Sequence, residues 1–287
     1  MRHTYVFALC FGSAVALSGC ESQMSDEEVE RAVAGVNVID ATGLNDIMLQ
    51  AGDPNEAVAY FSRSVQVNPD RVDLKRGLAQ SLVRAKKPSE AARVWAEVVA
   101  SAESTPNDQV EYADALIRAG DWAKAEDVLN RIPPTVETYD RYRLEAMVAD
   151  AGEDWKKADS FYETAIGLTT NPARVLNNWG YSKLTRGDFT GAEKLFLEAI
   201  TYDDGMFTAK NNLMMARGAQ RKYDMPVLAG SQTERAQLLH TLALAAIKQG
   251  DLTMGKTLLE EAIDTHPQHF DAAVRALRAL EANVQRG

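Results

Sequence analysis

The chain has 287 residues, with 31 lysines and arginines against 41 aspartates and glutamates, so its formal net charge is -10. A content of 46% hydrophobic residues is enough for a buried core and excludes disorder along the whole chain. The acidic balance argues against binding to nucleic acid or to an anionic lipid surface, because both need concentrated positive charge. Two cysteines, Cys10 and Cys20, are too few for a disulfide framework.

The first twenty residues have the pattern of an export signal. Arg2 precedes an uncharged, mostly apolar run over 4–17, which is shorter than the ~20 residues of a membrane-spanning helix. The run ends in the sequence LSGC at 17–20, which resembles the lipobox of bacterial lipoproteins. The resemblance implies that residues 1–19 are cleaved off as a lipoprotein signal peptide and that Cys20 is acylated. The alternative is an ordinary secretory signal with a chance cysteine.

The acylated cysteine would anchor the protein without a transmembrane helix, since lipid chains gain about 0.8 kcal/mol for each buried CH₂. Residues 20–37 are predicted to form a lipidated acidic tether. The residue after Cys20 is Glu21 rather than an aspartate, and by the same resemblance this permits export to the outer membrane. The expected location is therefore the outer membrane of a Gram-negative bacterium, with the protein facing the periplasm.

The remainder of the chain repeats itself with a regular period. A series of alanines marks it at equal intervals, except that the interval before Ala158 is shorter by one: Ala57, Ala91, Ala125, Ala158 and Ala192. A bulky residue follows each alanine by four positions: Phe61, Trp95, Leu129, Tyr162 and Phe196. A small residue lets two helices approach closely, and the bulky one fills the gap towards the next pair. One such pair cannot bury its apolar face alone, so several must stack.

These repeats resemble the tetratricopeptide repeat (TPR) in their period of roughly 34 residues. The sequences NWGY at 178–181 and KQGD at 248–251 are also similar to its pattern. The resemblance implies an all-α fold, a right-handed TPR superhelical solenoid of about six to seven helix pairs plus a C-terminal capping helix. The array is predicted over 38–205, and a degenerate repeat, a last TPR and the capping helix over 206–287. The capping helix is expected over 270–284, where apolar residues recur on one face.

Two places depart from the repeat. The short interval before Ala158 is accompanied by a turn at 152–155 that is predicted to have slipped by one position. In the sixth repeat a first helix is expected over 208–222, but Pro226 and Gly230 interrupt its partner. The array is therefore expected to bend or open there.

Residues 250–257 read GDLTMGKT and match the P-loop pattern of nucleotide-binding proteins. A P-loop must follow a strand, whereas the apolar residues of 238–249 recur at helical spacing. Gly255 falls where other repeats carry the small alanine, and Lys256 then becomes an exposed helix residue. Nucleotide binding is therefore not predicted, and Gly255→Ala is expected to leave stability unchanged or slightly raised, because alanine favours a helix.

Other catalytic or metal-binding patterns are weaker. His266 and His269 are two histidines at a repeat boundary, whereas a zinc site needs three or four ligands. No GxSxG, HExxH or CxxC motif occurs, and the carboxylates are scattered over helix faces. The four tryptophans are predicted to pack near helix crossings and turns: Trp95, Trp122, Trp155 and Trp179. The sequence therefore predicts no catalytic residue, no metal and no cofactor.

The concave face of a helix-pair solenoid, lined by the first helix of each pair, is the expected partner-binding surface. Polar residues recur on it at the repeat spacing: Arg76, Gln80, Arg84, Asp114, Arg118, Arg143, Asn177, Tyr181 and Asn211. The pairs 177–178 and 211–212 are both Asn-Asn and lie one full repeat apart, so their amides are expected in neighbouring turns. Such amides can hold the main chain of an extended peptide. The alternative for each residue is simple solvation of an exposed face.

The sequences of 237–251 and 264–270 are similar to the TPR lipoproteins of the tight-adherence (Flp) pilus assembly system. This similarity implies an outer-membrane-anchored scaffold that assembles or localises the secretin through which the pilus passes. The expected partners are the secretin or other pilus assembly components, with the membrane reached by the lipid anchor and no nucleic acid or nucleotide bound. The alternatives are an adaptor in outer-membrane protein assembly or peptidoglycan remodelling, and an ATP-using enzyme built on the P-loop match.

Overall fold

The computed structural model describes residues 43–284, and the chain divides into two compact units, Met1–Gly52 and Asp53–Gly287. The predicted signal peptide, Cys20 and the predicted tether lie outside the described residues. In the first unit the described residues form one helix, α3 (Leu44–Gln50), which follows the left-handed Gly43.

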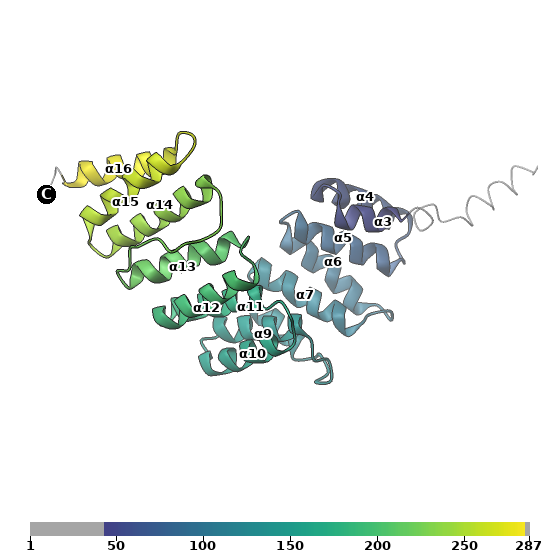
Figure 1. Ribbon diagram of the computed structural model, residues 1–287. Helices are drawn as coiled ribbons and strands as arrows, with labels where there is room; N and C mark the ends of the chain where they lie inside the picture. Colours follow the sequence, from purple (N-terminus) through teal and green to yellow (C-terminus); the bar gives the residue numbers. More distant parts are fainter. Residues whose placement is uncertain (1–42, 285–287) are drawn as a thin grey trace, which may run out of the picture. The chain divides into compact units, whose positions relative to one another are not determined.

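Helices are the regular secondary structure of the second unit in its described part (Figure 1). Its helices are α4 (Pro54–Val67), α5 (Val72–Arg84), α6 (Pro88–Ala100), α7 (Pro106–Ala119), α8 (Trp122–Leu129), α9 (Tyr139–Ala151), α10 (Trp155–Gly167), α11 (Ala173–Thr185), α12 (Phe189–Tyr202), α13 (Phe207–Ala219), α14 (Gln232–Lys248), α15 (Leu252–Thr265) and α16 (Asp271–Val284). Each helix packs against the next one in the chain. The predicted all-α solenoid of TPR type is confirmed.

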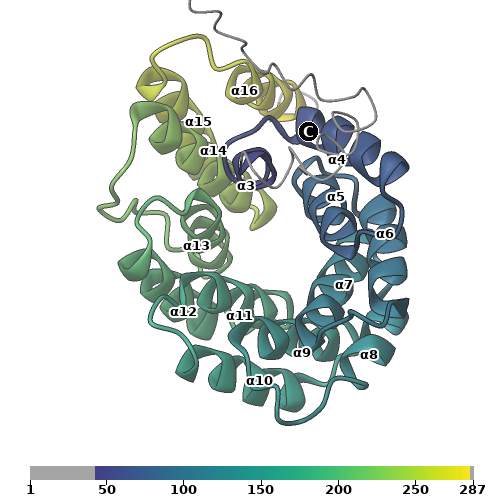
Figure 2. The same ribbon diagram turned by 90° about the vertical axis from the view of Figure 1, so that its right-hand side faces the viewer.

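The helices of the second unit alternate between two layers up to α13, and α14 then follows α13 in the inner layer (Figure 2). The first helices of the repeats, α5, α7, α9, α11, α13 and α14, form the inner layer, and α7, α9, α11 and α13 also contact one another in sequence. The second helices, α6, α8, α10, α12 and α15, form the outer layer. The hydrophobic core is accordingly a chain of local clusters between successive helices, as expected for a solenoid.

The turn after each inner helix contains a residue in the left-handed backbone region: Lys86, Gly120, Glu153, Gly187, Arg221 and Gly250. In four of these turns an aspartate follows and caps the outer helix by accepting a backbone N–H: Asp121, Asp154, Asp188 and Asp251. The predicted slip at 152–155 is wrong, because Glu153 simply occupies the position that glycine holds in the neighbouring turns. The missing residue of this repeat therefore lies before the turn, between Gly120 and Glu153.

The alanines of the repeat lie at the helix crossings and are completely buried, and the bulky residues that follow them are at most 2% exposed. The close approach is visible at two glycines of the inner layer. A Cβ added to Gly77 would lie 2.4 Å from Cε1 of Phe61, and one added to Gly180 would lie 2.6 Å from Cε1 of Phe196. Phe61 thus reaches the next repeat, as predicted, whereas Phe196 packs on the inner helix of its own pair.

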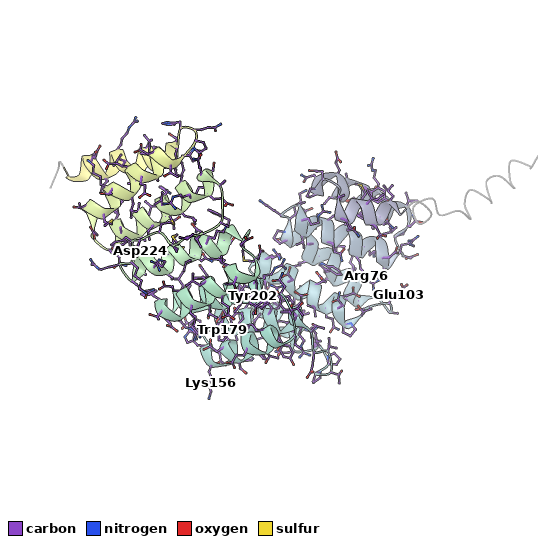
Figure 3. The ribbon with its side chains drawn as sticks, in the orientation of Figure 1. Arg76, Glu103, Lys156, Trp179, Tyr202 and Asp224 are labelled. Carbon is purple, nitrogen blue, oxygen red and sulfur yellow. The ribbon has the colours of Figure 1, made fainter. Side chains whose placement is uncertain are left out.

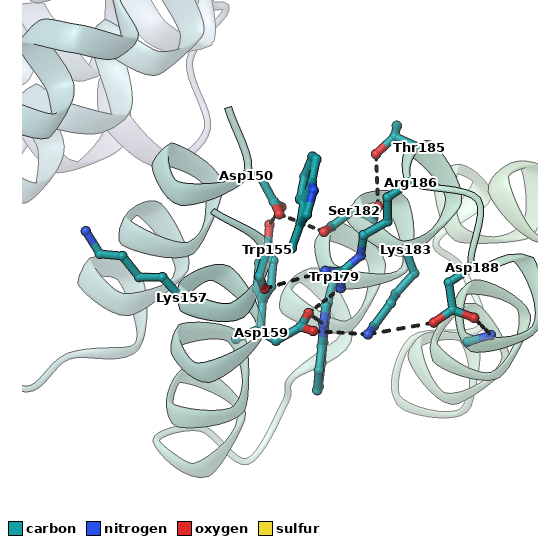
Figure 4. A network of polar contacts seen from close by, with 12 residues as sticks. Asp150, Trp155, Lys157, Asp159, Trp179, Ser182, Lys183, Thr185, Arg186 and Asp188 are labelled. Carbon is teal, nitrogen blue, oxygen red and sulfur yellow. Dashed lines mark hydrogen bonds and ion pairs between the residues drawn. The ribbon is translucent and has the colours of Figure 1, made fainter. Parts of the chain in front are cut away.

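Ion pairs, several of them partly buried, tie the outer helices to the inner helix of the next repeat. Asp159 follows the crossing alanine of α10 and accepts hydrogen bonds from Trp179 at 2.6 Å, from Lys183 at 3.1 Å and from Arg186, all on α11 or its end (Figure 4). Burial alone would raise the pKa of Asp159, but these hydrogen bonds outweigh it and lower the pKa.

The next repeat has the same arrangement. Glu193 follows the crossing alanine of α12 and accepts hydrogen bonds from Arg217 at 2.6 Å, Lys222 at 2.7 Å and Gln220 at 2.8 Å. Here too, burial opposes ionisation, while the three donors lower the pKa of the carboxyl group. Lys256 occupies the equivalent position in α15 and pairs at 2.8 Å with Glu281 of α16, so this tie has the opposite polarity.

The P-loop match is part of the last repeat. The residues before Gly250 form the helix α14 rather than a strand, Gly250 is the left-handed turn residue, and Gly255 lies buried inside α15. The expectation that alanine is harmless at Gly255 is wrong. A Cβ there would lie 2.4 Å from Cγ1 of Ile247 on α14. Ile247 is β-branched, so its Cγ1 atom has little freedom to move away.

The sixth repeat consists of one helix and an extended segment. Helix α13 ends at Ala219, earlier than the predicted 222, and no helix follows until α14. The buried Lys210 holds the segment 222–231 by donating to the Ala229 carbonyl at 2.6 Å. Of the two expectations for this place, a bend or an opening, the opening is wrong, because α13 packs directly on α14. A Cβ added to Gly218 would lie 2.3 Å from Cβ of Ala245.

None of the described helices has the length and apolar character needed to cross a bilayer.

Enlarging a crossing alanine should destabilise the array. Ala91→Leu, Ala125→Leu and Ala192→Leu each overfill a completely buried site, and each should lower the free energy of unfolding by about 1–3 kcal/mol. Lys194→Leu, on the exposed face of α12, should change it by less than ~0.5 kcal/mol. Urea denaturation of each variant measures both values. Leucine variants as stable as the wild type would contradict the assigned crossings.

Glycine at the left-handed turn residue should stabilise the protein. Glu153 has φ = 58°, a conformation that costs a residue with a Cβ roughly 1–2 kcal/mol. Glu153→Gly should therefore raise the free energy of unfolding by ~1 kcal/mol after the entropic cost of glycine. Glu153→Ala keeps the Cβ and is the matched control, expected to stay near the wild type. An equal gain in both variants would attribute the effect to the lost charge.

Gly255→Ala should destabilise the protein by roughly 1–2 kcal/mol, because the clash with Ile247 exceeds the gain of ~1 kcal/mol in helix propensity. Gly167→Ala is the control, since a Cβ there meets no atom within 4 Å and the variant should be no less stable than the wild type. Thermal and urea unfolding compare the two. Calorimetry with Mg·ATP tests the other interpretation, since saturable binding that is lost in Lys256→Ala would restore the P-loop.

Candidate functional site

Two rows of side chains cross the inner layer of the second unit, one residue from each inner helix. The Tyr181 row lies six residues before the left-handed turn residues and contains Gln80, Asp114, Met147, Tyr181, Met215 and Leu244. The Thr185 row lies two residues before the same turns and contains Arg84, Arg118, Ala151, Thr185, Ala219 and Lys248. Residues of one row are equivalent in the repeat, so they succeed one another along the array.

The chemistry of both rows changes along the array. The Tyr181 row begins with polar residues and continues with large apolar ones, of which Tyr181 is 51% exposed, Met215 40% and Leu244 45%. The Thr185 row begins with two arginines, continues with three small residues and ends in Lys248. Large side chains beside small ones leave recesses between them. The C-terminal half of the inner layer is therefore hollowed, and its walls are mainly apolar.

The first recess has a volume of about 450 Å³ and lies among α9, α11 and α13. Met147, Tyr181 and the exposed Trp122 supply its large apolar walls, and Ala151 and Thr185 leave it open. Trp122 was expected to be a packing residue, but 38% of its surface is exposed in this recess. Trp95, by contrast, is buried as expected.

The second recess has a volume of about 680 Å³ and lies among α11, α13 and α14. Its walls include Tyr181, Met215 and Leu244, and Lys248 stands at its end. Tyr181 and Thr185 line both recesses, which therefore form one continuous surface. We call this surface the Tyr181 groove.

The polar groups of the groove are bonded mainly to one another. Asp150 accepts hydrogen bonds from the Tyr162 and Ser182 hydroxyls, both at 2.7 Å, and burial raises the pKa of its carboxyl group. Asn212 donates to Asn177 at 3.0 Å, which confirms that the amides of the two Asn-Asn pairs meet in neighbouring turns. These contacts fix the shape of the groove.

Three predicted residues belong to this region. Asn177 and Tyr181 line the groove, whereas Asn211 lies beside it and accepts a hydrogen bond from Thr241 at 2.7 Å. The binding of a peptide main chain by these amides stays a prediction. Their mutual hydrogen bonds leave fewer free groups for that purpose than the sequence suggested.

The six predicted residues nearer the N-terminus are not part of the groove. Arg76 makes a bidentate pair with Asp108, at 2.8 and 2.9 Å, and donates to the main chain of Glu103 (Figure 3). Its charge therefore joins α5 to α7. Gln80 and Arg84 are half-buried members of the two rows.

Arg143 is the most buried of the predicted residues, at 5% exposure. It lies 3.4 Å from both Asp114 and Asp140, and Asp114 also pairs with the exposed Arg118. The geometry thus joins Asp114, Arg118 and Arg143 into one cluster between α7 and α9. This cluster balances charge within the array.

Sequence reasoning missed the apolar part of the groove. Met147, Tyr181 and Met215 are each one full repeat apart, the same period that singled out the asparagines, so the signal was present. In the sequence alone, however, apolar residues of an exposed inner face look like residues of the core. Lys248 appeared in the sequence only as part of KQGD at 248–251, which resembles the TPR pattern, and that resemblance gave no sign of a role in the groove.

Within 43–284 no three His, Cys, Asp or Glu side chains come together in a way that would hold a metal ion. His266 is engaged locally, with its Nδ1 accepting from the backbone N–H of Gln268 at 3.1 Å. The groove offers apolar recesses and a terminal ammonium group, which suit the side chains of a protein segment.

Comparisons with known proteins agree with the fold. A family model described as tetratricopeptide repeat matches residues 48–107. No curated protein sequence matches the chain. The structural neighbours include a chain of the APC/C hetero-tetramer Cut9–Hcn1, with a TM-score of 0.59 and 14% identity, over 88% of this chain and 52% of that one. The present chain thus spans about half the length of that neighbour.

Two further neighbours are of similar size to this chain. A tetratricopeptide repeat protein from Parabacteroides merdae has a TM-score of 0.57 and 12% identity, over 85% of this chain and 97% of its own. PilW, described as a widely conserved type IV pilus biogenesis factor, has a TM-score of 0.50 and 14% identity, over 75% and 94%. At these identities the likeness concerns the fold alone, which is a TPR-like solenoid of the kind that binds protein partners.

Proposed function

We propose that this protein is a lipid-anchored scaffold of the outer membrane that binds protein partners during assembly of the tight-adherence (Flp) pilus apparatus. Its task there is to assemble or localise the secretin. The observation that carries the proposal is the Tyr181 groove, an exposed apolar surface on a repeat array. Large exposed apolar surfaces on soluble proteins mark interaction sites.

Two further observations support the assignment to the cell envelope. The sequence LSGC at 17–20 resembles a lipobox, and the C-terminal repeats are similar to those of Flp pilus TPR lipoproteins. PilW shares the fold and is itself described as a pilus biogenesis factor, so a solenoid of this type is compatible with such a role. The match to the P-loop pattern does not favour an enzyme, since it coincides with a helix–turn–helix of the array.

Co-purification from detergent-solubilised envelopes tests the proposed partner. A C-terminally tagged wild-type protein should recover the secretin and other pilus components, identified by mass spectrometry. Tyr181→Ala should recover about tenfold less, because it removes an exposed apolar wall of the groove. Tyr202→Ala is the matched control, since Tyr202 is 49% exposed on the outer helix α12. Recovery of β-barrel assembly factors alone would assign the protein to outer-membrane protein assembly instead.

Cys20→Ser tests the anchor. The variant lacks the thiol that would carry the lipid, so fractionation should find it in the soluble periplasmic fraction or as uncleaved precursor. The wild type should sediment with outer membranes. A variant that is cleaved at the signal and still sediments with the membrane would contradict the lipoprotein assignment.

A further inference from the structure

We infer that the Tyr181 groove binds an extended protein segment that carries two bulky apolar side chains and an acidic residue beside them. The inference rests on the proposed function only in that the protein binds a protein partner through this surface. It goes further by naming the chemistry of the segment. Three features of the groove lead to it: the paired recesses, their spacing and the charge of Lys248.

The recesses call for side chains rather than for a main chain. Their walls include four large apolar residues whose exposed surface would otherwise contact water: Trp122, Tyr181, Met215 and Leu244. Covering such surface is favourable in proportion to its area. The asparagine amides that could grip a main chain are partly used, since Asn212 bonds to Asn177 and Asn178 contacts the Met147 sulfur at 3.3 Å.

The spacing of the recesses favours an extended segment. Tyr181 lines both recesses, and each recess lies over neighbouring inner helices. Packed helices are about 8–10 Å apart, and an extended chain advances about 3.3 Å for each residue. The two apolar side chains should therefore be about three residues apart.

The charge of the groove selects an acidic neighbour. Among the described residues, two charged side chains line the recesses, Asp150 and Lys248. Asp150 is partly buried and accepts two hydrogen bonds from hydroxyl groups, so it is already satisfied. Lys248 is exposed at the end of the second recess and forms no ion pair with the part of the chain that the structure describes. In a protein of net charge -10, this isolated ammonium group favours a carboxylate on the partner.

Selection from a random dodecapeptide phage library tests the inference with the purified protein. Wild-type protein should enrich peptides with two bulky apolar residues about three positions apart and an Asp or Glu at a constant offset from the second one. Lys248→Glu should instead enrich Lys or Arg at that offset. Lys194→Glu makes the same charge change on the outer helix α12 and should leave the acidic preference unchanged.

Fluorescence anisotropy with the best selected peptide then measures the contributions. Tyr181→Ala should weaken binding by about tenfold or more, whereas Tyr202→Ala should leave it within about twofold. Lys248→Glu should weaken binding by about three- to tenfold, and replacing the acidic residue of the peptide with lysine should restore it. The salt dependence of peptide binding should be smaller in Lys248→Glu than in the wild type, because the variant lacks the exposed ion pair that salt screens.

The outcomes separate this inference from the proposed function. Absence of enriched peptides, or an acidic preference that survives Lys248→Glu, would overturn the inference even if the secretin co-purifies. Equal binding by Tyr181→Ala and the wild type would overturn it as well. Conversely, the predicted peptides together with a failure to recover any pilus component would retain the groove chemistry and refute the pilus assignment.

Discussion

The close approach of two helices at each buried alanine is the contact on which the second unit depends. Because these alanines are completely buried, inner and outer helices of a pair lie near enough for a bulky residue one turn later to fill the space beside them. That geometry repeats at every pair and thereby fixes the positions of the inner helices. The rows of inner side chains follow from it, since equivalent residues must succeed one another at the helix spacing.

Charged contacts join each outer helix to the repeat that follows it in the chain. Asp159 and Glu193 each gather cationic side chains from the following inner helix, and Lys256 reverses the signs of the same contact with Glu281. Each tie joins successive repeats and not distant ones. The partial burial of Asp159 and the burial of Glu193 are tolerated because several donors surround each carboxylate and keep it ionised. The array is thus joined by local contacts throughout.

The fold could be predicted from the sequence because each repeat is marked by a small residue at the helix crossing and a bulky residue one turn later. The prediction failed where an unexpected residue adopts the backbone conformation of the repeat. Glu153 adopts the left-handed turn that glycine normally favours, and a Cβ at Gly255 is unfavourable only because of where Ile247 lies in three dimensions. The groove was half predicted: Asn177 and Tyr181 belong to it, but Arg76 and Arg143 hold helices together. Periodicity identifies a face, whereas pairing between distant side chains decides which of its charges remain free.

The residues that hold the helix pairs together are different from those that line the groove, and this separation affects how the sequence can change during evolution. Residues that hold the pairs together lie at the crossings, whereas Tyr181, Met215 and Leu244 project from the inner layer with much of their surface exposed. Substitutions in the exposed row cost little stability, so they can accumulate singly without loss of the fold. Partner preference is therefore open to gradual drift one repeat at a time, while the scaffold beneath it stays under strict constraint.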